Sequence, residues 1–202
     1  MALVWLIRID KAARNATAIA QLSQSGPAFA LEDAYRIQAA SIGERLNRGE
    51  VRSGVKMGFT SRAKAAQMGV FDLIYGRLTT GMFVADGGTL SLDDFVHPRV
   101  EPEIAYLLKS PMAWPVSPAE AMTHVEAVAP ALEIIDSRYK DFKFTLEDVV
   151  ADNCSSSGYV LGPWCKPDSD VANLGMVLEF DGRPVQIGSS AAILGHPARA
   201  LA

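Results

Sequence analysis

The feature of this sequence that most limits its possible folds is a glutamate inside an apolar run. Glu133 lies in Ala131-Leu132-Glu133-Ile134-Ile135, a segment whose composition favours a strand in the protein core. A carboxylate buried there costs free energy unless a positive charge lies beside it. The folded chain is therefore expected to place a cation or an arginine against this strand.

Two more glutamates lie two residues apart in a second predicted strand, which begins at Arg99 and runs to about Leu108. Alternate residues of a strand point to the same face, so the side chains of Glu101 and Glu103 are expected to project side by side. A cation held between these carboxylates and Glu133 would remove the cost of burial, and hard oxygen ligands suit Mg²⁺ or Mn²⁺. The alternative is that Glu101 and Glu103 form a solvated strand face and that Glu133 pairs with an arginine.

The composition bounds the class of protein. With 202 residues, 49% of them hydrophobic and 21% charged, the chain is expected to form one globular domain. A net charge of −4 gives no reason to expect nucleic acid as a partner, and no apolar run reaches the length of a membrane span. The apolar residues 1–7 are too few for a signal-peptide core, and Cys154 and Cys165 match no zinc spacing. A cytoplasmic protein with free thiols is predicted.

The first 50 residues are predicted to be mainly helical. An alanine-rich helix is expected over residues 9–24, and the spacing of apolar side chains predicts a second helix over residues 31–46. A short strand is expected over residues 54–59. Thr60 or Ser61 would then cap a helix that continues through residues 63–68.

Short strands dominate the prediction after residue 69. Asp86-Gly87-Gly88 is expected to be the turn of a hairpin between residues 82–84 and 89–92, and Asp181-Gly182 the turn of another. Ser117-Pro118-Ala119-Glu120 indicates a helix start, with the helix expected to end near Pro130, and a further short helix begins at Thr145. Helices followed by a mostly antiparallel β region predict an α+β fold in a single domain, residues 1–202.

Lys56 and a polar loop are further candidates for function. Lys56 lies between Gly54 and Gly58, and glycines allow a ligand to approach the backbone closely. Its ammonium would suit a bound carboxylate or a developing enolate, although a lysine that simply reaches water is the alternative. The loop over residues 152–158 is either an ordinary turn or a functional segment.

Taken together, these stretches resemble the 2-keto-4-pentenoate hydratase and 4-oxalocrotonate decarboxylase family, within the fumarylacetoacetate hydrolase superfamily. The order and spacing of the matching stretches agree from residue 33 onward; they are residues 33–38, 54–61, 101–105, 133–138, 150–153 and 195–197. The resemblance implies a mixed β-roll or sandwich with N-terminal helices in residues 1–50 and a β-rich catalytic part in residues 51–202.

The resemblance also implies the composition of the site. Glu101, Glu103 and Glu133 would bind Mg²⁺ or Mn²⁺, which would chelate the carboxylate and the 2-oxo group of a small 2-oxo acid substrate. Lys56 and Asp152 are implied as catalytic residues. Lys56 and Ser155 are implied as substrate-binding residues.

Four stretches resemble the decarboxylase branch more than the hydratase branch: residues 56–58, 66–70, 136–144 and 191–197. The implied reaction converts 4-oxalocrotonate (2-oxohex-3-enedioate) to 2-hydroxypenta-2,4-dienoate and CO₂ in the meta-cleavage catabolism of aromatic compounds, with no Schiff base at Lys56. The alternatives are a 2-keto-4-pentenoate hydratase and an inactive partner subunit or fragment. The family also suggests a homo-oligomer and a complex with the related hydratase or decarboxylase.

Two departures from the family pattern bear on these expectations. Thr80 lies in the segment where related sequences carry an aspartate, which would remove a helper in proton transfer. Related sequences also continue beyond a Gly-His-Pro segment, so the chain is expected to be truncated at its C-terminus and to lack strands that would close the β-structure.

Overall fold

The computed structural model describes residues 2–61, 73–113 and 115–202. Within these ranges the chain is α+β, with its two longest helices first and its strands after them, as the sequence predicts. The residues group into two compact units. The first comprises Met1–Gly58, Ile74–Glu101 and Glu133–Val160, and the second comprises Phe59–Leu73, Pro102–Leu132 and Leu161–Ala202.

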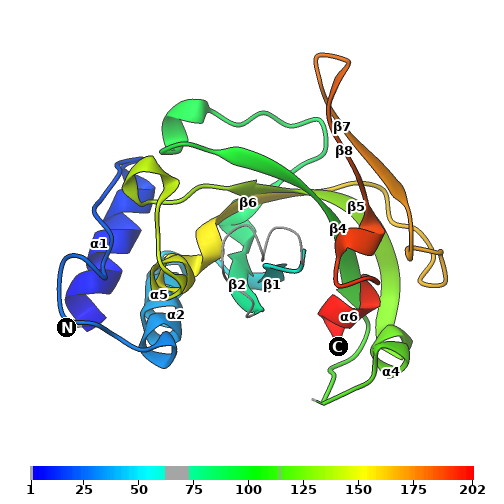
Figure 1. The fold of residues 1–202 in the computed structure, drawn as a ribbon, viewed down its shortest axis with the longest axis horizontal. Helices are drawn as coiled ribbons and strands as arrows, with labels where there is room; N and C mark the ends of the chain where they lie inside the picture. The colour runs from blue at the N-terminus through cyan, green and yellow to red at the C-terminus, as the bar shows by residue number, and fades with distance from the viewer. Residues whose placement is uncertain (1, 62–72, 114) are drawn as a thin grey trace. The chain divides into compact units, whose positions relative to one another are not determined.

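Helices α1 (Ala2–Arg14) and α2 (Leu31–Asn47) pack against each other in the first unit, and α5 (Leu146–Ala151) packs against α2 (Figure 1). Trp5 and Ile9, four residues apart on α1, are buried together on one face of that helix. The bounds of α2 confirm the helix predicted over residues 31–46.

The side-chain amide of Gln38 links three elements of this unit. Gln38 is fully buried on α2, and its Nε2 donates hydrogen bonds to the carbonyls of Tyr75 and Val150, both at 3.0 Å. A buried amide needs such partners because an unpaired polar group in the core destabilises the fold. Gln38 therefore ties α2 both to the strand containing Tyr75 and to α5.

The helix predicted over residues 9–24 is wrong in its bounds, because α1 begins at Ala2 and ends at Arg14. Ala16 has a φ of +46°, which is outside the helical region. Beyond it, Ile19 pairs with Tyr139 and Leu22 is fully buried. These tertiary contacts override the helix propensity of an alanine-rich segment, which is a weak determinant.

Strands β1 (Arg52–Gly58) and β2 (Ile74–Thr79) form an antiparallel pair in which Lys56 lies opposite Gly76. The strand predicted around Lys56 is thus confirmed. The pairing matters for function because it fixes which side of β1 carries the lysine.

A second sheet has the strand order β3-β6-β5-β4. Its strands are β3 (Phe83–Val84), β4 (Arg99–Leu108), β5 (Val125–Ile135) and β6 (Ser156–Leu161). Strands β4 and β5 confirm that all three glutamates lie on strands. The hairpin predicted across Asp86-Gly87-Gly88 is wrong, because β3 pairs in parallel with β6 and the chain after the turn forms a 3₁₀ turn at Leu92–Asp94. Turn residues show where the chain reverses but not which strand it joins.

Helix α4 (Pro118–Thr123) begins as predicted, with the Ser117 hydroxyl accepting a hydrogen bond from the backbone N–H of Glu120 at 3.2 Å. Its expected end near Pro130 is wrong, because β5 has already begun at Val125. Val125 and Val128 are buried in one core cluster with Val171, and this packing favours the strand. The short helix predicted at Thr145 is confirmed as α5, which begins with a capping box.

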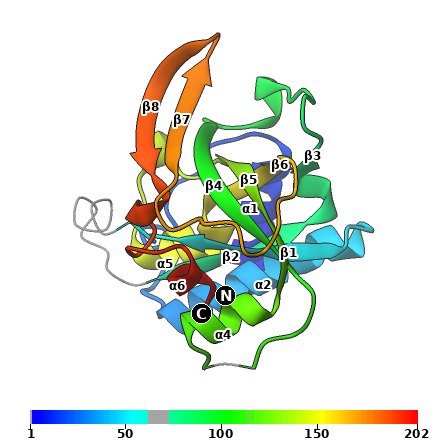
Figure 2. The same cartoon turned by 90° about the vertical axis from the view of Figure 1, so that its right-hand side faces the viewer.

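The second unit also contains the hairpin formed by β7 (Gly175–Phe180) and β8 (Arg183–Ser189), which Figure 2 shows as a two-stranded arm. Its turn residues, Asp181 and Gly182, have φ values of +52° and +71°, and the predicted hairpin is confirmed. Helix α6 (Ala198–Leu201) packs against α4 in the same unit.

The helix predicted over residues 63–68 lies outside the described residues. Across the ranges that the structure does describe, each helix is either too short or too polar to cross a lipid bilayer.

Candidate active site

Three acidic side chains come together on β4 and β5. Glu101 and Glu103 occupy alternate positions of β4, and Glu133 lies on the neighbouring strand. One carboxylate oxygen of each lies within 4.8 Å of those of the other two. Carboxylates this close repel one another, and positive charge among them relieves the repulsion. Three converging oxygen donors of this kind fit a divalent cation such as Mg²⁺ or Mn²⁺.

Glu133, which is only 4% exposed, has two partners from the first unit. The Lys56 ammonium lies 3.0 Å from Oε2, and the Ser156 hydroxyl donates to Oε1 at 2.9 Å. Burial raises the pKa of Glu133, and these two partners oppose that shift. Burial alone would lower the pKa of Lys56, but the charge of Glu133 makes the net shift upward. The basic side chain beside Glu133 is therefore a lysine, and not the arginine of the alternative interpretation.

A left-handed turn, Asn153–Ser155, follows α5 and brings a backbone carbonyl to Lys56. The φ values of its three residues are +52°, +53° and +60°. For residues other than glycine this conformation costs roughly 1–2 kcal/mol each, so other contacts must hold it. The carbonyl of Cys154 accepts a hydrogen bond from the Lys56 ammonium at 3.3 Å. The turn thus supplies Lys56 with a second partner besides Glu133.

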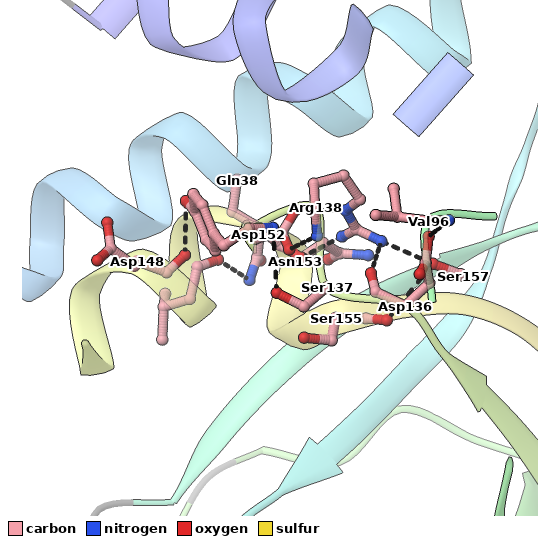
Figure 3. A network of polar contacts seen from close by, with 12 residues as sticks. Gln38, Val96, Asp136, Ser137, Arg138, Asp148, Asp152, Asn153, Ser155 and Ser157 are labelled. Carbon is pink, nitrogen blue, oxygen red and sulfur yellow. Dashed lines mark hydrogen bonds and ion pairs between the residues drawn. The ribbon is translucent and has the colours of Figure 1, made fainter. Parts of the chain in front are cut away.

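Arg138 and Asp152 form a buried ion pair at the start of this turn (Figure 3). Arg138 donates to the two carboxylate oxygens of Asp152 from its backbone N–H, at 2.9 Å, and from Nε, and it donates from Nη2 to the backbone carbonyl of Asp152. Its Nη1 donates to the Ser157 hydroxyl at 2.6 Å. Burial raises the pKa of Asp152 to about 6, against the opposing effect of Arg138. The pair therefore anchors the residue from which the turn starts.

Asn153 anchors the turn to β2. Its side-chain oxygen accepts from the Arg77 N–H at 2.7 Å, and its side-chain nitrogen donates to the Arg77 carbonyl at 2.9 Å. Gly76 permits this approach, because a Cβ at that position would lie 2.7 Å from the Asn153 carbonyl oxygen and 3.2 Å from the aliphatic stem of Lys56. Any larger residue at position 76 requires the backbone to shift.

The predicted site residues lie as follows. Lys56 and Glu133 are in direct contact, and Asp152, the residue that precedes the turn, is fully buried. Ser155 is buried within the turn, and its hydroxyl has no hydrogen-bond partner among the residues that the structure describes. Thr80, at the position where an aspartate was expected, accepts a hydrogen bond at Oγ1 from the Val51 N–H at 3.0 Å.

Sequence reasoning did not single out three residues that shape this site: Gly76, Arg138 and Asn153. Arg138 and Asn153 lie in stretches that carry the family resemblance, but no role was assigned to them. An arginine can be buried where an acidic partner neutralises its charge. The sequence alone does not show that Arg138 pairs with Asp152. Gly76 is important because the Asn153 carbonyl and the Lys56 side chain pack against it, and these contacts are not visible in the sequence.

A pocket of about 210 Å³ in the first unit is separate from the glutamate cluster. Neither Lys56 nor Glu133 lines it, and its lining residues include Met82, Arg138 and Ser157. Ser157 and the Ser156 partner of Glu133 are consecutive on β6, so their side chains point to opposite faces of that strand. The pocket therefore lies on the face of β6 away from Glu133.

Comparisons with known proteins identify relatives of the chain. A family model described as the fumarylacetoacetate (FAA) hydrolase C-terminal region matches residues 46–202. A 4-oxalocrotonate decarboxylase from Pseudomonas sp is 59% identical over 194 residues, which are 96% of this chain and 75% of that protein. A 2-hydroxyhexa-2,4-dienoate hydratase from Comamonas testosteroni is 36% identical over 200 residues, which are 96% of this chain and 76% of that protein. The structure of 4-oxalocrotonate decarboxylase from Pseudomonas putida G7, complexed with magnesium and adipate, matches with a TM-score of 0.93 at 37% identity and covers 99% of this chain and 78% of that one.

Proposed function

The chain belongs to the fumarylacetoacetate hydrolase family, and we propose that it is a metal-dependent lyase that converts 2-oxohex-3-enedioate to 2-hydroxypenta-2,4-dienoate and CO₂. The observation that carries the proposal is the convergence of Glu101, Glu103 and Glu133, with the Lys56 ammonium against Glu133. The similarity to 4-oxalocrotonate decarboxylases over nearly the whole chain supports the choice of substrate.

The proposed ligands of Mg²⁺ or Mn²⁺ are the three glutamates. Their oxygens are hard donors at mutually close positions, and a divalent cation would offset their repulsion. A related decarboxylase structure contains magnesium, which supports the choice of a divalent metal. When bound, the cation would act as a Lewis acid toward the negative charge that develops on the 2-oxo oxygen of the substrate.

Lys56 is proposed to bind the dianionic substrate and to stabilise developing negative charge as an ammonium. A protonated amine has no lone pair with which to attack the 2-oxo group, so we expect no imine. In the reaction, the bond to the distal carboxylate breaks and CO₂ leaves. The electron pair moves through the conjugated double bond toward the 2-oxo oxygen, and protonation of the resulting dienolate gives the product. Ser155 is proposed to donate its hydroxyl to the substrate, because that hydroxyl has no hydrogen-bond partner within residues 2–61, 73–113 and 115–202.

An ultraviolet assay of the purified protein tests this function. We expect 2-oxohex-3-enedioate to be consumed with release of CO₂ in the presence of Mg²⁺, and the reaction to stop when EDTA is added. Sodium borohydride added with substrate should leave the enzyme active. Irreversible inactivation by borohydride, with little effect of EDTA, would contradict the metal-and-ammonium chemistry in favour of an imine.

A hydratase is the second candidate, favoured by the similarity to a dienoate hydratase across the same length of chain. The same glutamates and Lys56 would bind 2-hydroxypenta-2,4-dienoate, and the reaction would add water to give 4-hydroxy-2-oxopentanoate. Offering each substrate separately distinguishes the two. Consumption of the dienoate without turnover of 2-oxohex-3-enedioate would assign the hydratase.

We also propose that the chain self-associates. Val177 and Ile187, which are paired across the β7–β8 hairpin, are 56% and 80% exposed, and exposed apolar residues of this kind favour association. Light scattering during size-exclusion chromatography tests this. Mixing the chain with the related hydratase tests the expected complex in the same experiment.

A further inference from the structure

We propose that the buried Arg138–Asp152 ion pair is a positioning element of the active site. It holds the Asn153–Ser155 turn in the conformation that directs the Cys154 carbonyl at the Lys56 ammonium. Neither Arg138 nor Asp152 needs to touch the substrate for this, so Asp152 acts indirectly. The inference rests on the proposed function only for the measurements of kcat and KM, and the measurement of thiol reactivity is independent of it.

The turn would not keep its shape without external contacts. Three consecutive residues in the left-handed region, none of them glycine, form a conformation that L-residues rarely adopt. Strained backbone of this kind persists where the surrounding structure holds it, and it is found at functional sites. The contacts that hold this turn therefore determine where the Cys154 carbonyl points.

Arg138 and its neighbours fix both ends of the turn. At the first end, the guanidinium and the backbone N–H of Arg138 bind the side chain and the carbonyl of Asp152. At the far end, the Asp136 N–H donates to the Ser155 carbonyl at 2.7 Å, and Nη1 of Arg138 donates to Ser157 at 2.6 Å. Figure 3 shows the guanidinium lying between these two groups of contacts. One side chain thus spans the strained segment.

The consequence for Lys56 follows from the geometry of an ammonium. The group has three N–H donors in a tetrahedral arrangement. One is directed at Glu133 and another at the Cys154 carbonyl, at 3.0 and 3.3 Å. These two bonds fix the orientation of the ammonium that is proposed to bind the substrate. If the turn relaxes, the Cys154 carbonyl moves and the ammonium loses this orientation.

Cys154 itself reports on the turn. Its thiol is buried, whereas Cys165, the other cysteine, is exposed. In a Cys165→Ser background, the rate at which a disulfide reagent modifies the folded protein therefore measures the exposure of Cys154 alone. This readout needs no substrate and no metal.

The experiment compares four variants in that background. Arg138→Met removes the guanidinium, and Arg138→Lys keeps a buried positive charge without the forked geometry. Arg138→Met leaves the charge of Asp152 buried without its partner, and the protein then fails to fold if this cost is too large. The double variant Arg138→Met/Asp152→Asn removes both charges and avoids that cost, so it replaces the single variant in that case. Arg48→Met is the matched control, because Arg48 forms a two-pronged ion pair with Asp10 on α1, away from the turn.

For Arg138→Met and for the double variant we expect kcat to fall about 100-fold with KM within about threefold, because misplacement of a reacting group affects mainly the chemical step. Cys154 should react about tenfold faster than in the parent, since the turn opens locally. Arg138→Lys should show the same changes to a smaller extent, and Arg48→Met should show neither.

Two results would overturn the inference. One is a folded Arg138 variant that retains kcat within threefold and a slow Cys154 reaction. The other is an Arg48→Met protein that loses kcat equally, which would show that any lost ion pair has this effect. If the parent turns over neither substrate, it is the proposed function that fails. The thiol rates then decide the positioning role alone, and unchanged rates refute it.

Discussion

Replacing Gly76 with alanine tests the closest backbone approach in the site. The new Cβ would lie 2.7 Å from the Asn153 carbonyl oxygen and 3.2 Å from Cγ and Cδ of Lys56. The first neighbour is backbone and cannot rotate away, so β2 or the left-handed turn must move. Overpacking of this kind costs about 1–3 kcal/mol. We also expect kcat to fall, because the displaced segments hold both the stem of Lys56 and the residue before Cys154.

Gly54→Ala on the paired strand β1 is the matched control. A Cβ at Gly54 meets only the Leu78 side chain, at 3.8 Å, which is an ordinary contact. Both substitutions reduce the conformational entropy of the unfolded chain, which raises the free energy of unfolding by about 0.4–1 kcal/mol. This contribution is the same for the two variants and cancels when their free energies of unfolding are compared. In urea unfolding followed by circular dichroism, Gly76→Ala should be less stable than Gly54→Ala by about 1–3 kcal/mol. Equal unfolding midpoints and equal kcat values would show that the turn does not press on β2.

Three further predictions use separate assays. Glu103→Gln should weaken Mn²⁺ binding roughly tenfold or more in calorimetric titration, because a neutral amide replaces a charged ligand; unchanged affinity would remove Glu103 from the proposed site. Burial raises the pKa of Cys154 to about 12, so at pH 8 its thiol stays protonated and iodoacetamide should label only Cys165 in the folded protein, with both labelled in urea. Gly43→Ala, at a position in α2 where a Cβ meets nothing within 4 Å, should raise the unfolding free energy by about 0.5–1 kcal/mol, and a decrease would mean that this face of α2 is covered.

The features that could be predicted are those determined by neighbours in the sequence. The alternation of Glu101 and Glu103 along a strand, the capping at Ser117 and Thr145, and the turn at Asp181 follow from geometry within a few residues. The need for positive charge at Glu133 also follows from local burial. Each of these depends on chemistry that a short window of sequence contains.

What could not be predicted depends on pairing between distant segments. The lysine that meets Glu133 lies far away in the sequence, and the sequence pattern did not identify it as the partner of Glu133, for which an arginine was the alternative to a metal. Val84 joins β6 and not the strand expected after the next turn, because sheet partners are chosen by packing of the whole unit. The left-handed conformation of Cys154 was equally hidden, since the residue type disfavours it and only contacts with the rest of the unit maintain it.

The link made by Gln38 has a consequence for how the chain folds as it is made. The carbonyl of Val150 that receives its hydrogen bond lies 112 residues further along the chain. At roughly 5–20 residues per second, a ribosome needs about 6–22 s to synthesise that interval. Helix α2 is therefore complete long before α5 can cover its buried face. Throughout that interval the Gln38 amide and the apolar residues around it remain exposed on the nascent helix. We expect a molecular chaperone to bind this face of α2 during synthesis.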